Sequence, residues 1–194
     1  EGVALIENQE IEGPGPDRGV VFQAAALFEW MTVADNITFS LRCARRPAAE
    51  RSKVAKEMAA LVGLSGFEDS YPYQLSGGMR QRVGLARVLA AKPKVMLMDE
   101  PFAALDVQTR EMLQEEIIRI REHTGCTIIF VTHSIDEAVF LGDRIFLMTD
   151  LKQGKFDEYR VELPEPRHAS ENRISPDFIH MRETIYRQMR KPGK

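Results

Sequence analysis

The sequence from residue 75 to residue 106 opens with Leu75-Ser76-Gly77-Gly78-Met79-Arg80-Gln81-Arg82. Ser76, Gly77 and Gly78 stand directly before a run of helix formers. Backbone N–H groups and the positive end of the helix dipole make such a helix N-terminus suited to phosphate oxygens. Glycine also lets an anion approach the backbone closely. The pattern therefore predicts a phosphate-binding helix start.

A short apolar run follows, Val95-Met96-Leu97-Met98, and it ends at Asp99 and Glu100. This pattern is typical of a buried parallel strand that reaches the carboxyl edge of a sheet, where ligands bind in open α/β folds. One acid there can hold Mg²⁺, a hard cation that prefers oxygen ligands. The next can orient or deprotonate a water for attack on a phosphoryl group.

The ordered combination of these two motifs with Ala104-Leu105-Asp106 resembles the ATP-binding subunit of ABC transporters. The resemblance implies an α/β fold: a P-loop NTPase (RecA-like) core with a mainly parallel sheet and an inserted helical subdomain. It implies a homodimer that sandwiches two ATP molecules, in which Ser76, Gly77 and Gly78 of one copy face the nucleotide of the other. Asp99 becomes a Mg²⁺ ligand, Glu100 the catalytic base and Asp106 a residue of the dimer seam.

Gln23 follows an apolar strand, so we expect it at the same sheet edge as Asp99, where its amide oxygen can reach Mg²⁺ or the attacking water. The resemblance makes it the Q-loop glutamine. The segment before it, Gly13-Pro14-Gly15-Pro16-Asp17-Arg18, is similar to importers of nitrate, aliphatic sulfonates and taurine. Import, rather than export, rests on this similarity.

His133 ends the β-branched run Thr127–Thr132, and Ser134 is an N-cap candidate for a helix from Ile135 to Phe140. If the two strands are neighbours, His133 lies beside Asp99 and Glu100. A lone histidine at a strand end is more often structural than catalytic. The resemblance assigns it as the switch histidine, which contacts the γ-phosphate and the attacking water.

The phosphate-cradling motif G-x-x-x-x-G-K-[ST] does not occur in the sequence. The resemblance places it immediately before Glu1, with the aromatic residue that stacks on adenine, so the sequence is interpreted as N-terminally truncated. As written, we expect the polypeptide to bind ATP weakly or not at all. The intact protein is expected to be an ATPase with ATP and Mg²⁺ as cofactors.

We divide the sequence into four regions with distinct expected roles. Residues 1–30 are part of the ATPase core, 31–91 a helical subdomain, 92–150 the rest of the core and 151–194 a C-terminal extension. A helical pattern runs from Val33 to about Leu64, with Pro47 in a first turn and Gly63 as a stop. The basic helix near 176–189 is expected to pack on its own domain; binding to anionic lipid or a regulator is the alternative.

Three arginines of the helix after Gly78, namely Arg80, Arg82 and Arg87, are available for acidic or phosphate partners, with surface salt bridges as the default expectation. Phe28 and Trp30 have two open interpretations: cover for the local core, or anchors for a coupling helix of the permease.

Composition limits the remaining possibilities. With 194 residues, 44% of them hydrophobic, the chain can bury a substantial core. A net charge of −3 argues against wholesale nucleic-acid binding. No apolar run is long enough to cross a bilayer, so membrane association must come through a partner. Cys43 and Cys126 have no metal-binding or redox spacing and are interpreted as thiols of a reducing cytosol.

The expected function is the ATP-binding subunit of an importer, peripheral at the cytoplasmic face of the membrane, for nitrate, sulfonate, taurine or a similar small solute. Permease subunits would contact the region from Gln23 to Trp30, and a solute-binding protein would act indirectly. An ATPase of chromosome maintenance would carry a heptad-repeat insertion between Gln23 and Leu75, and none is present. The other alternative is a non-catalytic fragment that serves only for dimerisation or permease binding.

Overall fold

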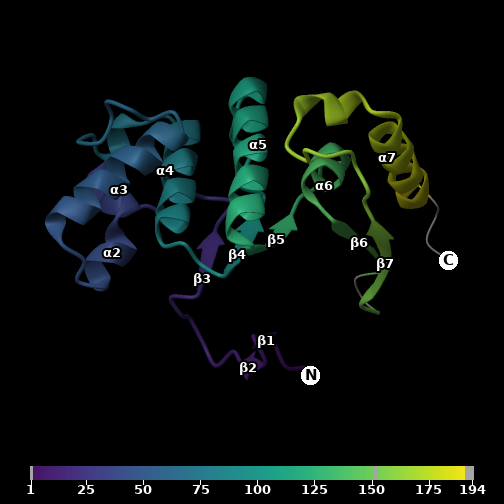
Figure 1. Ribbon diagram of the computed structural model, residues 1–194, viewed down its shortest axis with the longest axis horizontal. Coiled ribbons are helices and arrows are strands. Elements are labelled where there is room, and N and C mark those ends of the chain that lie inside the picture. The colour runs from purple at the N-terminus through teal and green to yellow at the C-terminus, as the bar shows by residue number, and fades with distance from the viewer. Residues whose placement is uncertain (1, 151–152, 191–194) are drawn as a thin grey trace. The chain divides into compact units, whose positions relative to one another are not determined.

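The structure is a computed structural model that describes residues 2–150 and 153–190 (Figure 1). The chain forms two compact units. The first comprises Glu1–Ala104 and Cys126–Ile129, and the second comprises Leu105–Gly125 and Phe130–Lys194. No helix within the described residues is long and apolar enough to cross a membrane.

A three-stranded sheet has the strand order β3 (Arg18–Val21), β4 (Val95–Asp99) and β5 (Thr127–Val131), and the last two residues of β5 belong to the second unit. β3 and β4 are parallel, with Arg18 opposite Val95 and Val21 opposite Met98. A separate antiparallel pair, β1 (Leu5–Ile6) and β2 (Gln9–Glu10), precedes them. The predicted α/β fold with a parallel sheet is confirmed.

The faces of β4 differ in burial. Met96 and Met98 are buried, whereas Leu97 between them is 37% exposed. The sequence predicted a buried strand, and in the structure the face of β4 that carries Met96 and Met98 is buried. Close contact is found where β3 meets α4 (Gly77–Ala90): a Cβ added at Gly19 would lie 2.5 Å from Val88 Cγ1.

The region from Val33 to Leu64 is helical as predicted, but it is not one continuous helix. Two interruptions, at Thr38 and between Ala44 and Pro47, divide it into α1 (Val33–Ile37), α2 (Phe39–Cys43) and α3 (Ala48–Leu61). Pro47 is the N-cap of α3 and not a first-turn residue as predicted. Proline disfavours a helical conformation in the residue before it, so the helix cannot extend back through Arg46. Gly63 ends this region with φ of 66°.

After η1 (Pro72–Gln74), α4 follows in the first unit, and its buried apolar residues include Val83, Leu85, Ala86, Val88 and Leu89. Its arginines were expected to form salt bridges, and that expectation was wrong. Arg80 donates to the Leu75 carbonyl at 2.8 Å, Arg82 to Val62 and Gly63, and Arg87 to Ala26, the last three at 3.0 Å. For Arg82 the reason is clear: carbonyls beyond the end of a helix lack partners within the helix.

The second unit contains α5 (Val107–Thr124), α6 (Ile135–Leu141), η2 (Ser170–Ile174) and α7 (Pro176–Met189). β6 (Arg144–Asp150) pairs antiparallel with β7 (Lys155–Arg160), a strand that the polar sequence after Asp150 did not predict. The apolar core of the second unit includes seven buried residues: Ile118, Val139, Phe140, Ile145, Val161, Phe178 and Ile185.

The C-terminal helix packs back on its own unit, as predicted. α7 contacts α6, and its Phe178 and Ile185 are each only 2% exposed. Burying two large apolar side chains in the shared core stabilises the docked position of the helix. Ser175 caps its start by accepting a hydrogen bond from the Phe178 N–H.

Candidate nucleotide site

Gln23 and Glu100, separated by 77 positions in sequence, are brought together by the parallel pairing of β3 and β4. Because Val21 is opposite Met98, the residues that follow both strands emerge at one edge of the sheet. There the Gln23 Nε2 donates a hydrogen bond to the Glu100 Oε2 at 3.3 Å. The prediction that Gln23 stands at the edge formed by the end of β4 is confirmed.

Glu100 has an unusual backbone conformation. Its φ is 44°, in the left-handed region that residues with a Cβ rarely adopt. Asp99, the last residue of β4, is exposed, and Glu100 is half-buried at the turn that follows. Backbone strain of this kind is concentrated at functional sites, so an observed outlier beside an exposed carboxylate supports a functional assignment.

The helix that starts at the glycine pair also holds the segment that follows β3. Gln81, only 3% exposed, donates to the Phe22 carbonyl at 2.9 Å. A Cβ at Gly84 would lie 3.2 Å from the Ala25 carbonyl oxygen, so the chain passes close to the helix here. Arg87 binds the next carbonyl, Ala26, and burial lowers the pKa of its guanidinium. Gln81, Gly84 and Arg87, spaced three residues apart on α4, thus hold residues 22–26 against the helix.

The Ser76-Gly77-Gly78 motif forms the N-terminus of α4, as predicted. Ser76 is the N-cap, and its Oγ accepts a hydrogen bond from the Met79 N–H at 3.2 Å. Ser76 and Gly77 are exposed, and a Cβ built at Gly77 would have no atom within 4 Å apart from those of its chain neighbours and of the backbone of its own helix. The backbone N–H groups of this helix start are therefore accessible to an anion.

Residues 28–32 form a short aromatic segment that one buried side chain organises. Asn36, which is fully buried, donates through Nδ2 to the carbonyls of Phe28, Met31 and Thr32 at 3.0 to 3.1 Å. Its Oδ1 accepts from the Phe28 N–H at 2.9 Å. Trp30 is 73% exposed, with its ring centroid 5.5 Å from that of Phe28. The segment thus presents an exposed tryptophan from an ordered backbone.

Asp106 and His133 belong to the second compact unit. Asp106 is the N-cap of α5 and accepts a hydrogen bond from the Thr109 N–H at 2.9 Å. His133 is an exposed residue in the turn between β5 and α6, and Ser134 caps α6 as predicted. Their roles beside Asp99 and Glu100 stay predictions.

Several buried polar residues that organise these segments were missed by the sequence reasoning: Asn36, Gln81, Gln114 and Glu137. For Gln81 a signal existed, because it stands four positions before Leu85 and seven before Val88, on the apolar side of the helix. Asn36 and Gln114 carry no such signal, since a single polar residue in a helix is usually exposed.

The oxygen donors at the sheet edge suit Mg²⁺ in type. Asp99 supplies a carboxylate, and the Gln23 amide oxygen remains an acceptor while its Nε2 donates to Glu100. Within residues 2–150 and 153–190, no group of three or more His, Cys, Asp or Glu side chains could hold a metal ion. Mg²⁺ commonly takes one or two carboxylates and completes its shell with water and substrate phosphates, so a donor set of this size fits it.

Comparison with known proteins identifies the family of the chain. The ABC transporter family model matches residues 1–103. An uncharacterized ABC transporter ATP-binding protein of Methanocaldococcus jannaschii is 50% identical over 95% of this chain and 68% of its own length. A taurine import ATP-binding protein of Pelagibacter ubique is 43% identical over 95% of this chain and 71% of its own. A nitrate import ATP-binding protein of Synechocystis is 41% identical, with the same two coverages.

A solved structure agrees in fold. A dimeric ATP-binding cassette in a post-hydrolysis state, bound to ADP and Pi, superposes with a TM-score of 0.75. Its sequence is 33% identical, over 84% of this chain and 74% of the cassette. The family model, the sequence identities to the relatives and the shared fold agree, and this chain belongs to the ABC transporter ATP-binding proteins.

Proposed function

We propose that the protein is the ATP-binding subunit of an ABC importer that couples ATP binding and hydrolysis to uptake of a small solute. The observation that carries the proposal is the hydrogen bond between Gln23 and Glu100 at the carboxyl edge of β3 and β4. The names of the taurine and nitrate relatives support import, and they suggest nitrate, taurine, a sulfonate or a similar small solute.

In the proposed hydrolysis, Glu100 orients and deprotonates the attacking water. Asp99 and Gln23 would hold Mg²⁺, which neutralises phosphate charge when bound. His133 would contact the γ-phosphate, while Ser76, Gly77 and Gly78 would bind the nucleotide of the second copy in a homodimer. Asp106 would lie at the seam between the copies. Because Gln23 donates to Glu100, a change at the sheet edge would be transmitted to the segment after Gln23.

The aromatic segment is the proposed contact with the membrane-spanning subunits. Phe28 and Trp30 differ in their surroundings, and we propose a different role for each. Phe28 is half-buried, lies 4.5 Å from Phe39 between ring centroids and has Arg87 over its face. Trp30 is largely exposed. A tryptophan held on an ordered backbone is a typical interface anchor, so Trp30 is assigned to the permease and Phe28 to its support. The subunit would then be peripheral at the cytoplasmic face of the membrane.

The test is ATP hydrolysis by the full-length protein with Glu100→Gln, a change that keeps an oxygen acceptor for Gln23 but removes the base. We expect the hydrolysis rate to fall about 10²- to 10⁴-fold. Glu57→Gln is the matched control, because Glu57 is an exposed carboxylate whose only described ion pair is with Lys53. Unchanged hydrolysis in Glu100→Gln would show that the base is assigned wrongly.

The alternative is a non-catalytic module that binds partners only. Calorimetric titration of the full-length protein with ATP and Mg²⁺ separates the two functions. The proposed ATPase binds ATP, and Glu100→Gln retains that binding while losing turnover. Absence of ATP binding in the wild-type protein would favour the non-catalytic module.

A further inference from the structure

Hydrogen bonds connect Thr132 and Ser134, the residues on either side of His133, to Glu137. Thr132 Oγ1 donates to the Glu137 Oε2 at 2.5 Å, and the same hydroxyl accepts from the Ser134 N–H at 3.0 Å. The Ser134 Oγ in turn accepts from the Glu137 N–H at 3.3 Å. These three hydrogen bonds close a compact ring around the turn that carries His133. Glu137 is only 9% exposed, so water competes little for its oxygens.

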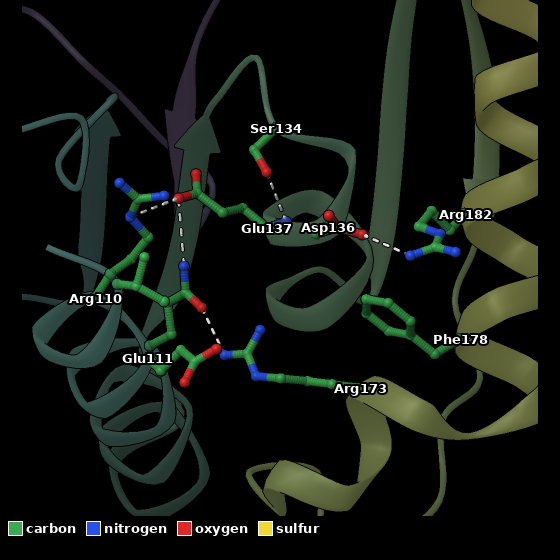
Figure 2. Close-up of a pocket in the computed structure, with 10 residues that line it drawn as sticks. Arg110, Glu111, Ser134, Asp136, Glu137, Arg173, Phe178 and Arg182 are labelled. Atoms are coloured by element: carbon green, nitrogen blue, oxygen red, sulfur yellow. Dashed lines mark hydrogen bonds and ion pairs between the residues drawn. The ribbon is translucent and has the colours of Figure 1, made fainter. Parts of the chain in front are cut away.

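The second oxygen of Glu137 faces α5. Gln114, which is 2% exposed, donates from Nε2 to the Glu137 Oε1 at 3.3 Å. Arg110 Nε lies 3.9 Å from the same oxygen. Figure 2 shows the side chains of Arg110 and Glu137 converging from different helices. Both carboxylate oxygens are therefore engaged, one by the turn before α6 and the other by α5.

The C-terminal part of the chain completes this arrangement. Arg173, in η2, donates from Nη2 to the Gln114 Oε1 at 2.6 Å. Its guanidinium lies over the buried ring of Phe140, 3.6 Å from the centroid. A continuous path of hydrogen bonds therefore leads from Arg173 through Gln114 and Glu137 to Thr132. Because Gln114 has one amide oxygen and one amide nitrogen, an arginine on its oxygen directs its Nε2 toward Glu137.

The cavity beside this path, of about 300 Å³, has no excess charge of either sign. Its charged lining consists of Arg110, Arg173 and Arg182 with Glu111, Asp136 and Glu137 (Figure 2). Arg182 Nη1 is 3.7 Å from Asp136 Oδ1, which links α7 to α6 by another ion pair. Balanced charges favour a structural link between elements over an anion site.

We infer that Glu137 is a positioning residue for the turn that carries His133, and that Gln114 and Arg173 extend this hold to the C-terminal part of the chain. The inference rests on the proposed function insofar as His133 is taken to act in hydrolysis. The C-terminal extension thereby gains a specific role, because the order of the His133 turn depends on Arg173, far along the chain. Loss of Arg173 frees the Gln114 amide to rotate, and Glu137 then loses a donor.

The first test measures order directly, without nucleotide, by amide hydrogen exchange of the full-length protein. In Arg173→Gln we expect exchange at Ser134 and Glu137 to rise several-fold, and in Glu137→Ala about tenfold or more, the loss expected for a hydrogen bond to a charged group. Arg187→Gln is the matched control, since Arg187 is an exposed arginine of α7 paired with Glu183. If the Ser134 amide exchanges at the same rate in Arg173→Gln and in Arg187→Gln, the proposed path from Arg173 to Thr132 is wrong.

The second test separates positioning from general stability. If Glu137 positions the turn, Glu137→Ala lowers kcat for ATP about tenfold with little change in KM. Glu137→Gln, which keeps an oxygen acceptor for Thr132, recovers much of the loss. Where His133→Ala abolishes hydrolysis, equal kcat in wild type and Glu137→Ala, or a change in KM alone, contradicts the inference.

His133→Ala distinguishes failure of this inference from failure of the proposed function. If hydrolysis survives in His133→Ala, the catalytic role of His133 is wrong, and the exchange data alone decide whether the path exists. If His133→Ala abolishes hydrolysis while Arg173→Gln leaves both exchange and kcat unchanged, the path is wrong and the proposed function stands.

Discussion

Replacing Asn36 with alanine should destabilise the protein through groups that lose their partners. The side chain makes four hydrogen bonds to the backbone of residues 28–32. The carbonyls of Phe28 and Thr32 also accept backbone hydrogen bonds, from the Met31 and Asn36 N–H groups. The Phe28 N–H and the Met31 carbonyl have no other described partner. The main cost of the substitution therefore comes from these two groups.

The expected magnitude follows from that count. A buried donor or acceptor left unsatisfied costs about 1–3 kcal/mol, so two such groups cost roughly 2–6 kcal/mol. Phe28 and Met31 are half-buried rather than fully buried, and water can reach them in part, which favours the lower half of this range. With a urea m-value of about 2 kcal/mol/M, the midpoint of unfolding should move down by about 1–2 M.

The assay is urea denaturation followed by circular dichroism, with Asn36→Asp and Glu29→Ala as companion variants. Aspartate keeps the acceptor for the Phe28 N–H but places a carboxylate against three carbonyls, so Asn36→Asp should be at least as unstable as Asn36→Ala. Glu29 is exposed in the same segment, and its removal should change the free energy of unfolding by less than about 0.5 kcal/mol. A midpoint for Asn36→Ala within about 0.3 M of wild type, less than a third of the smallest expected shift, would refute the reasoning.

Two further predictions concern other buried groups. Arg167, 4% exposed, donates to three backbone carbonyls of the second unit, and burial lowers the pKa of its guanidinium. Arg167→Met should lower the free energy of unfolding by about 2–4 kcal/mol in calorimetry; a loss no larger than that of Arg187→Met would contradict this. Burial raises the pKa of the Cys126 thiol, whereas Cys43 is exposed. Alkylation by iodoacetamide at about pH 8, read by peptide mass spectrometry, should therefore modify Cys43 first, and faster labelling of Cys126 would refute the described burial.

Local patterns predicted most elements of the fold. The Ser76-Gly77-Gly78 motif marked the start of α4 and Ser134 the start of α6, and the structure confirms both. These signals work because capping and amphipathic spacing involve residues a few positions apart.

The failures have physical causes too. β7 was missed because its pairing with β6 sets its conformation, and Lys155–Arg160 alone has no long apolar pattern. Arg82 was expected to find a carboxylate, but it lies beside the carbonyls of Val62 and Gly63, whose position depends on how α3 and α4 pack. Partners of long polar side chains are decided by that packing and leave little trace in sequence.

The sequence by itself determined the family and the chemistry available to it. The glycine pair before a helix and the acids after an apolar strand require only neighbouring residues to be read. Tertiary structure decided which distant groups meet: Gln23 with Glu100, 77 positions apart, and Arg173 with Gln114, 59 apart. Strand register and helix packing set these contacts, because a hydrogen bond needs its two atoms within about 3 Å, a condition that only the folded chain fulfils.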